Sequence, residues 1–283
     1  MYPAGEAGIV VRRITAREGV ALRVLEAGPP SSLTAVLVHG WAGSVYSFAE
    51  TIPALAAAGF RVVAIDLPGH GLSGKPRDAT SYSVPALADA VSAVIAACDV
   101  QRYVMVAHSM SGAIAFELAG RSRGQPAGVV FVGAVGVGRV PLAPVARFLT
   151  PGAVTAALPS LLGRQLARLV VGLAFGTRGR PTERDVDEYW APTQFDGFAH
   201  ALSACLHRAN WHREPVEVLR GFTLPTLVIA GARDHVVWGV ARGGRYISGA
   251  RVLEVEGAGH LVMQECATTV NPEILNFLRS FGS

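Results

Sequence analysis

The sequence predicts an α/β fold built on a mostly parallel sheet of eight strands flanked by helices. Short runs of apolar, β-branched residues alternate along the chain with longer stretches of helical periodicity, and this alternation is typical of βαβ units with right-handed crossovers. One apolar run ends on a serine flanked by small residues, directly before a helical stretch. The length of 283 residues and the hydrophobic content of 51% suffice for one large core with an insertion.

The predicted elements follow in chain order. Two opening strands at Ile9–Thr15 and 21–26 are joined near Glu18-Gly19, and Pro29-Pro30 marks the loop that follows. We expect the remaining strands at 34–38, 61–65, 102–107, 128–134, 225–230 and 251–255. We expect core helices at 46–58, 84–98, 110–121 and 272–281.

The regular alternation stops after Gly138, where prolines separate several short helical segments. We therefore expect a core domain at 1–138 and 216–283, with a helical cap inserted at 139–215. The most apolar stretch of this cap, 156–175, contains Pro159, Arg164, Gln165 and Arg168. Those residues are unfavourable in a membrane span of about 20 apolar residues, so an amphipathic cap helix is expected and membrane insertion is not.

The serine-centred turn lies at 104–112 and indicates a nucleophile elbow at Ser109. In such a turn a strand passes sharply into a helix, and the residues two positions either side of the serine must be small. Ala107 and Ser111 meet this requirement, although the usual pattern is G-x-S-x-G. An ordinary strand-to-helix turn is the alternative, so the partners that a nucleophilic serine needs must be sought elsewhere in the chain.

Candidate partners for Ser109 follow other predicted strands, in a chain order that is compatible with a catalytic triad. His39-Gly40-Trp41 follows the strand at 34–38, Asp234 follows the strand at 225–230, and His260 follows the strand at 251–255. With Ser109, these residues make the chain resemble the α/β-hydrolase superfamily, whose triad runs Ser, then Asp or Glu, then His. The stretch 66–74 is similar to the D-x-P-G-x-G-x-S turn of that family, and Gly259-His260 with Glu265 to its G-H-x-x-x-x-E-x-P ending. Ala267 and Trp238 stand at positions where that family commonly has proline. Because neither is a triad residue, these departures concern the subfamily and not the chemistry.

The resemblance implies a site and a mechanism. His260 would take the proton of Ser109 as the serine attacks a carbonyl carbon, and Asp234 would orient the imidazole. The backbone N–H groups of Trp41 and Met110 would form the oxyanion hole. Aromatic residues of the core and cap are candidate substrate contacts: Trp41, Tyr46, Phe48, Trp190, Phe195, Phe198 and Trp211, with Met110 beside them.

Other polar residues have simpler interpretations. His108 would point away from Ser109 in an elbow, His235 would be a loop residue, and Glu256 a solvated one. Loosely spaced cap residues match no metal-ligand spacing, so we expect neither metal nor cofactor. These residues are His200, His207, His212, Asp185, Asp187 and Glu188.

Composition limits the partners. The net charge is +4 and the pI about 9.2, but Lys75 is the only lysine and the arginines are scattered, unlike the basic clusters of nucleic-acid surfaces. Cys98, Cys205 and Cys266 form no disulfide or metal pattern, and no secretory signal precedes the first strand. We therefore expect a cytoplasmic protein that binds a small molecule and no nucleic acid.

The predicted activity is hydrolysis of carboxylic esters or lactones with small to medium, largely apolar acyl groups. Ser109 argues against dehalogenase and epoxide hydrolase chemistry, for which similar folds use aspartate at the elbow. Within the superfamily, carbon–carbon bond hydrolysis, thioesterase, amidase and cofactor-free perhydrolase or haloperoxidase activities remain alternatives, because fold does not fix function. A small-molecule receptor that retains the triad is the alternative outside enzymes.

Overall fold

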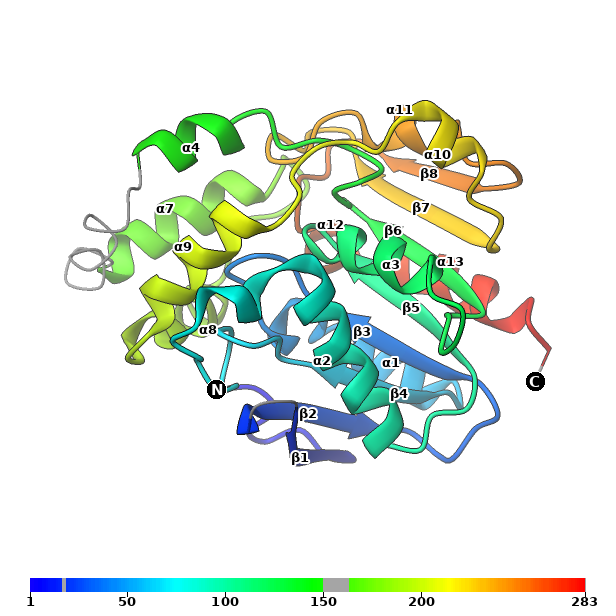
Figure 1. Cartoon of the computed structure of the whole chain (residues 1–283), viewed down its shortest axis with the longest axis horizontal. Coiled ribbons are helices and arrows are strands. Elements are labelled where there is room, and N and C mark those ends of the chain that lie inside the picture. Colours follow the sequence, from blue (N-terminus) through cyan, green and yellow to red (C-terminus); the bar gives the residue numbers. More distant parts are fainter. Residues whose placement is uncertain (17–18, 150–162, 283) are drawn as a thin grey trace.

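A computed structural model of the chain describes residues 1–16, 19–149 and 163–282. Its centre is an eight-stranded sheet with the order β1-β2-β4-β3-β5-β6-β7-β8 (Figure 1). The strands are β1 Ile9–Thr15, β2 Ala21–Ala27, β3 Thr34–Val38, β4 Arg61–Ile65, β5 Tyr103–His108, β6 Gly128–Val132, β7 Thr226–Gly231 and β8 Arg251–Val255. β1 and β2 pair antiparallel, β2 pairs antiparallel with β4, and all other pairs are parallel. The predicted α/β architecture is therefore confirmed.

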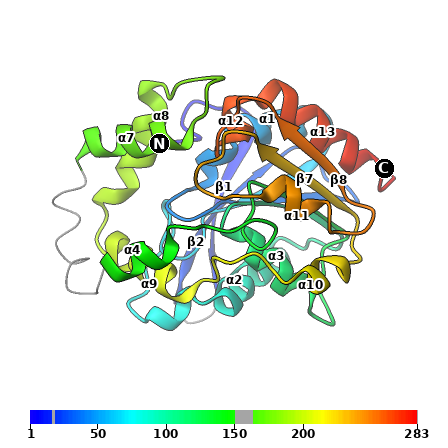
Figure 2. The same cartoon turned by 90° about the horizontal axis from the view of Figure 1, so that it is seen from above.

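Helices cover both faces of the sheet (Figures 1 and 2). One face carries α1, α12 and α13; the other carries α2, α3, α10 and α11. Their bounds are α1 Thr51–Ala57, α2 Val84–Ala97, α3 Ser111–Ala119, α10 Val216–Arg220, α11 Val240–Gly244, α12 Val262–Glu265 and α13 Ala267–Arg279, and the short 3₁₀ helices are η2 Val45–Phe48 and η3 Ala79–Tyr82.

The central strands are buried on both sides, which explains why their sequences are almost wholly apolar. Every residue of β3, β5, β6 and β7 is buried. Successive side chains enter opposite layers: Val36 and Val38 belong to the core under α2 and α3, whereas Ala35 and Leu37 belong to the core under α1 and α13. The carboxyl ends of these strands therefore form a rigid platform for the loops that follow them.

Two predicted helices differ from the observed ones. The stretch 46–58 is divided into η2 and α1, since Pro53 in the first turn of α1 has no N–H to continue a helix from the preceding residues. The last helix begins at Ala267 and contains Pro272 inside it, five residues after its start. Val270, Ile274 and Leu278 are fully buried along one face of α13, and this packing offsets the one backbone bond that the proline removes.

Several helices are inserted between β6 and β7. They are α4 Ala143–Leu149, α7 Arg164–Ala174, α8 Glu183–Trp190, η4 Ala191–Gln194 and α9 Phe198–Arg208, and they gather on one side of the sheet in both views (Figures 1 and 2). Thr182 and Asp185 form a capping box at the start of α8. Glu18, Pro151, Pro159 and the first part of the 156–175 stretch lie outside the described residues.

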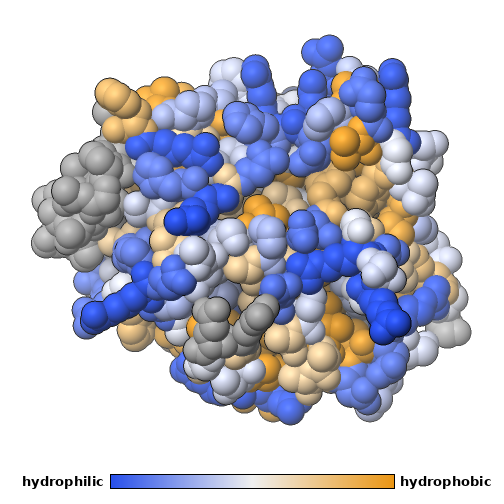
Figure 3. Space-filling view, viewed as in Figure 1, coloured by the Kyte–Doolittle hydropathy of each residue, from blue (hydrophilic) through white to orange (hydrophobic). Residues whose placement is uncertain are grey.

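The surface of the inserted helices is partly apolar. Leu142, Val145 and Phe148 are exposed at α4 and immediately before it, and apolar residues gather there at the upper left of Figure 3. None of the helices within the described ranges has both the length and the apolar character needed to cross a bilayer.

Candidate active site

Ser109 follows β5, the strand near the middle of the sheet, on a sharply turned backbone. Its φ is +56°, a left-handed conformation that is strained for any residue with a Cβ atom. The turn is fixed from the β6 side: the Ser109 N–H donates to the Val132 carbonyl at 3.0 Å, and the Ser109 carbonyl accepts from the N–H of Val135 at 2.9 Å. This geometry has the features of a nucleophile elbow.

Small residues allow the turn to form. A Cβ atom on Gly40 would lie 2.6 Å from the Cβ of Ser109, so the loop after β3 passes directly against the serine. The Ser111 hydroxyl lies 2.7 Å from the carbonyl oxygen of Val38 and 2.9 Å from that of His108. Ser111 therefore contributes a bond to the turn where the usual motif has glycine.

Ser109, His260 and Asp234 form a continuous hydrogen-bonded relay. The Nε2 atom of His260 lies 2.9 Å from the Ser109 Oγ, and its Nδ1 atom lies 2.8 Å from the Oδ2 of Asp234. The other carboxylate oxygen of Asp234 accepts from the N–H groups of Val236 and Val237, at 2.8 and 2.9 Å. The side chains of His260 and Asp234 are 8% and 4% exposed. A neutral His260 that donates from Nδ1 to Asp234 leaves Nε2 free to accept the Ser109 proton.

Gly133, which follows β6, packs against this relay. It was not among the site residues predicted from the sequence. Its φ is +52°, and a Cβ atom there would lie 3.2 Å from the Nδ1 of His260 and 3.3 Å from the Oδ2 of Asp234. A glycine directly after a central strand is the signal that could have identified it.

Two backbone N–H groups near the serine are unused. Neither Trp41 nor Met110 donates its backbone N–H to another group within the described part of the chain. His39 fixes the Trp41 loop, because its Nδ1 atom lies 2.7 Å from the Gly40 carbonyl oxygen and its Nε2 atom accepts from the Leu67 N–H at 3.0 Å. Burial lowers the pKa of His39, which favours the neutral ring that can donate and accept at once.

His108 lies beside His260 but bonds to its backbone. The two rings are 4.8 Å apart, and the His108 Nε2 atom lies 3.2 Å from the His260 carbonyl oxygen. Burial, followed by the neighbouring His260, lowers the pKa of His108 well below its usual value. His235 and Glu256 are exposed on loops, and their carbonyl groups accept from Trp238 and Arg178.

Ser109 opens into a cavity of about 360 Å³ whose described lining is almost wholly apolar. The wall that contains the polar groups comprises the 40–43 loop with Ser47, His108, Ser109, Tyr189 and His260. The opposite wall comes largely from the inserted helices and includes Leu142, Ala143, Ala146, Val170, Val171, Leu173, Ala174, Leu206 and Trp211. Lys, Arg, Asp and Glu are absent from the lining contributed by residues 1–16, 19–149 and 163–282. The volume falls within the usual range for small-molecule sites.

Only two of the seven aromatic candidates line this cavity. Trp41 and Trp211 meet edge to face with ring centroids 6.4 Å apart, and the Trp41 indole donates to the Leu202 carbonyl on α9 at 2.9 Å. The apolar face of α7, which supplies much of the wall, was predicted as an amphipathic helix but not as a substrate contact.

The other five aromatics lie elsewhere, which corrects the prediction. Tyr46 points toward α8 and donates to Asp185 at 2.8 Å, while Phe48 and Phe198 are 1% exposed in the core. Phe195 is 47% exposed, with the Lys75 ammonium 5.3 Å from its ring centroid. Trp190, half-buried at the end of α8, is not part of the described lining. The direction in which a helix turns each aromatic ring depends on tertiary packing that the sequence alone does not reveal.

The polar residues of the inserted helices are engaged separately. Asp187 pairs with Arg164, Glu188 accepts from the Tyr2 N–H, and the His200 Nε2 atom contacts the Arg77 carbonyl. No group of three possible metal ligands occurs among the residues described.

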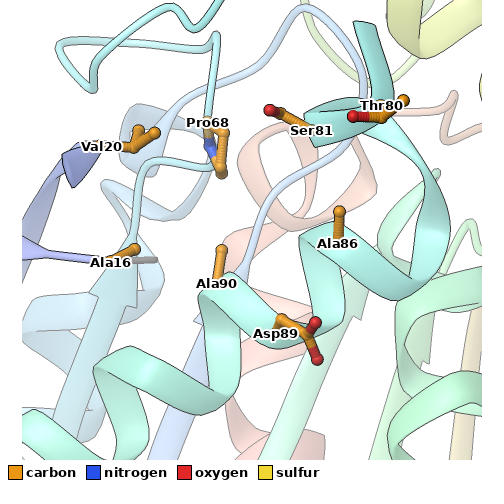
Figure 4. Close-up of a pocket in the computed structure, with 8 residues that line it drawn as sticks. All are labelled: Ala16, Val20, Pro68, Thr80, Ser81, Ala86, Asp89 and Ala90. Carbon is orange, nitrogen blue, oxygen red and sulfur yellow. The ribbon is translucent and has the colours of Figure 1, made fainter. Parts of the chain in front are cut away.

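A second cavity lies away from Ser109, between α2, η3 and the turn that precedes β2 (Figure 4). Its volume is about 120 Å³, and its lining includes Pro68, Ser81 and Asp89. Asp89 pairs with Arg121 at 2.9 Å. Neither Ser109 nor His260 lines this second cavity, whereas both line the cavity described above, which is therefore the candidate active site.

This combination of fold and relay is that of an α/β hydrolase. The family described as the alpha/beta hydrolase fold matches residues 36–265, and the chain belongs to that family, which confirms the resemblance. It is similar to the dihydrolipoyllysine-residue acetyltransferase component of the acetoin cleaving system of Pseudomonas putida, with 31% identity over 92% of this chain and 67% of that protein. It is also similar to epoxide hydrolase A of Mycobacterium tuberculosis, with 27% identity over 96% of this chain and 98% of that protein.

The fold likewise matches that of an esterase from Exiguobacterium antarcticum. The TM-score is 0.77 at 19% identity, and the match covers 95% of this chain and 100% of the other. At this identity the similarity concerns the fold alone.

Proposed function

We propose that the protein is a serine hydrolase that cleaves carboxylic esters or lactones with small to medium, largely apolar acyl groups. The observation that carries the proposal is the relay of Ser109, His260 and Asp234 at the floor of an uncharged, apolar cavity. The inserted helices, predicted at 139–215, act as the cap that shapes this cavity.

The chemistry follows from the hydrogen bonds. The Nε2 atom of His260 accepts the Ser109 proton as the Oγ atom attacks the carbonyl carbon, and Asp234 stabilises the imidazolium that forms. The unused N–H groups of Trp41 and Met110 stabilise the oxyanion of the tetrahedral intermediate, each contributing about 3 kcal/mol or more. His260 then protonates the leaving alcohol, and water, activated by the same ring, hydrolyses the acyl-enzyme.

The identity of the nucleophile separates this activity from epoxide opening, the activity in the name of the Mycobacterium relative. A carboxylate that opens an epoxide forms an ester, which water can hydrolyse afterwards. A serine would instead form an ether, which no water attack at a carbonyl could release. Ser109 therefore supports turnover at acyl carbons, where an acyl-enzyme can be formed and hydrolysed.

The cavity lining favours a neutral substrate. An anionic substrate would be buried without a cationic partner, at a large cost in free energy. Residues 150–162, which fall between the described parts of the inserted region, contain none of Asp, Glu, Lys or Arg. Trp41 and Trp211 provide aromatic surface next to the serine, which suits an apolar acyl group.

Location is part of the same proposal. Cys98, Cys205 and Cys266 are all buried and free, as expected of a protein in a reducing compartment. We propose that the activity is cytoplasmic.

The test compares the parent protein with Ser109→Ala on p-nitrophenyl esters of short, medium and long acyl chains. We expect many turnovers by the parent and at least about a 10³-fold loss in the variant, because the nucleophile is gone while the cavity remains. A matched sample is treated with a fluorophosphonate, which should add one phosphonyl group at Ser109.

Two outcomes would contradict the proposal. Hydrolysis retained by Ser109→Ala would place the chemistry at another residue. A parent that is labelled at Ser109 but turns over none of the esters would instead favour another acyl or carbon–carbon bond substrate.

A further inference from the structure

The carboxylate of Glu265 accepts hydrogen bonds from four backbone N–H groups. Its Oε2 atom accepts from Gly176 at 2.9 Å and from Gly259 at 2.7 Å. Its Oε1 atom accepts from Arg178 at 2.8 Å and from Gly179 at 3.0 Å. Sequence reasoning placed Glu265 in a family motif without assigning it a role.

These four donors belong to two different segments. Residues 176–179 follow α7 in the inserted region, whereas Gly259 directly precedes His260. The two segments also bond directly: the His260 N–H donates to the Ala174 carbonyl at 2.7 Å, and the Thr177 N–H donates to the Gly257 carbonyl at 2.7 Å. We call this set of contacts, together with Glu265, the 176–259 junction.

The two backbones pass too closely for larger residues. A Cβ atom on Gly259 would lie 2.4 Å from the Gly176 nitrogen, and one on Gly176 would lie 2.2 Å from the Gly257 carbonyl oxygen. The junction is therefore packed as a unit. One end of it is α7, whose Val170, Val171 and Ala174 line the cavity, and the other end is His260.

We propose that Glu265 is a positioning residue: by joining residues 176–179 to Gly259, it holds His260 within bonding distance of Ser109. The inference rests on the proposed function, because it assigns His260 the role of base. His260 has no strand of its own to fix it, since it lies five residues beyond the end of β8, and the junction supplies that rigidity. A misplacement of about 1 Å at a reacting group can cost about 100-fold in rate.

A carboxylate is specifically suited to this position. Its two oxygens present about four acceptor sites, which match the four N–H groups. Glutamine would keep one oxygen but direct an NH₂ group at N–H donors, leaving some of them buried without a partner. Glu265→Gln therefore tests the junction with almost no change in volume, and Glu265→Asp restores the carboxylate on a side chain shorter by one methylene.

The matched control is Glu256→Gln. Glu256 lies in the same loop as Gly259 and is exposed. Its carboxylate makes no hydrogen bond or ion pair with the other described residues, so the substitution removes the same charge without altering the junction. Circular dichroism and thermal melting serve to check that each variant is folded at the assay temperature.

The measurement is the second-order rate constant for fluorophosphonate labelling of Ser109, which depends on His260 and on no particular ester. We expect Glu265→Gln to lower it by about 10–100-fold, Glu265→Asp to restore part of the loss, and Glu256→Gln to change it by less than about twofold. With a hydrolysed ester, kcat should fall by the same factor while KM stays within about threefold. Hydrogen exchange at residues 175–180 and 257–260 should accelerate in Glu265→Gln, to a smaller extent in Glu265→Asp, and not in Glu256→Gln.

The outcomes separate the two proposals. A parent protein that fails to react at Ser109 would refute the proposed function and this inference together. A reactive parent with an equally reactive Glu265→Gln would refute this inference alone, as would a variant whose KM rises while kcat is unchanged. If Glu265→Gln does not fold, Glu265→Asp decides in the same assay, since labelling at the parent rate with accelerated exchange would mean that the junction does not position His260.

Discussion

At Ser109 and Gly40, two loops approach so closely that the size of one side chain decides the geometry. Ser109 adopts a φ of +56°, a conformation that costs about 1–3 kcal/mol and persists only where the surroundings impose it. The bonds from Val132 and Val135 impose it from one side. Gly40 contributes from the other side, because it leaves room for the serine.

Gly40→Ala should therefore abolish most of the reactivity of Ser109. The new Cβ atom would lie 2.6 Å from the Ser109 Cβ, so the serine or the 40–43 loop must move, and we expect labelling by fluorophosphonate to slow by about 100-fold or more. Gly120→Ala is the control, because its Cβ atom would meet only ordinary contacts at 3.6 Å. Equal labelling of both variants would show that the two loops are not tightly packed in solution.

Among the elements, β2, β4 and η2 are joined by one buried carboxylate. Asp66, just after β4, accepts from the Arg23 guanidinium at 2.7 Å, from the Val45 N–H at 2.8 Å and from the Leu72 N–H at 2.7 Å. Arg23 and Asp66 are 3% and 0% exposed. The loop that contains Trp41 is thus bound to the strand layer through η2.

Asp66→Ala should lower the free energy of unfolding by about 3–5 kcal/mol, because it leaves the Arg23 charge buried without its partner. Urea unfolding followed by circular dichroism measures the change. Glu254→Ala, which removes an exposed carboxylate 3.8 Å from Arg245, should cost less than about 1 kcal/mol. A comparable loss in both variants would mean that the Arg23–Asp66 pair is not buried in solution.

The sequence predicted strands better than helix ends or side-chain directions. Central parallel strands are buried at every position and almost wholly apolar, so β3, β5, β6 and β7 were located within two residues at either end. Helix ends depend on local bonds, as at Pro53 and Pro272. Ser109, Asp234 and His260 were recognisable because each follows a strand at the same edge of the sheet. The positions of Phe195 and Phe198 relative to the cavity depend on how the inserted helices pack, which no local pattern encodes.

At the scale of the whole molecule, three of the buried histidines make folding sensitive to acid. His39 and His70 are 0% exposed and His108 is 3% exposed. Burial lowers the pKa of all three, that of His70 to about 3, from the ordinary value of 6.5. The His70 Nε2 atom is buried without a partner in the described structure, so a proton there would create a desolvated cation.

Stability should consequently fall as the pH drops below about 6.5. In that range the unfolded chain binds a proton on each of these histidines while the folded chain does not, so each ring lowers the unfolding free energy by about 1.4 kcal/mol per pH unit. Above pH 6.5 the contribution of the neutral rings is fully present; for His70 the loss continues down to about pH 3. Urea unfolding at pH 7, 6 and 5 measures the slope.

His70→Gln isolates one of these rings. Whatever the stability of the variant at pH 7, its unfolding free energy should depend less steeply on pH. Between pH 6 and 5 the slope should be smaller than that of the parent by about 1.4 kcal/mol per pH unit. An unchanged slope would indicate that His70 is already protonated in the folded protein.

The uncharged cavity lining also bears on what happens after cleavage. An ester is neutral, but the acid released from it is a carboxylate anion at neutral pH. The described lining offers no lysine or arginine to this anion, and an unpaired carboxylate in apolar surroundings is far less stable than in water. For the proposed ester substrate, bond cleavage thus converts a neutral ligand that the cavity binds well into an anion that it binds poorly. Release of the acid product is therefore favoured, and the site is left free for the next substrate molecule.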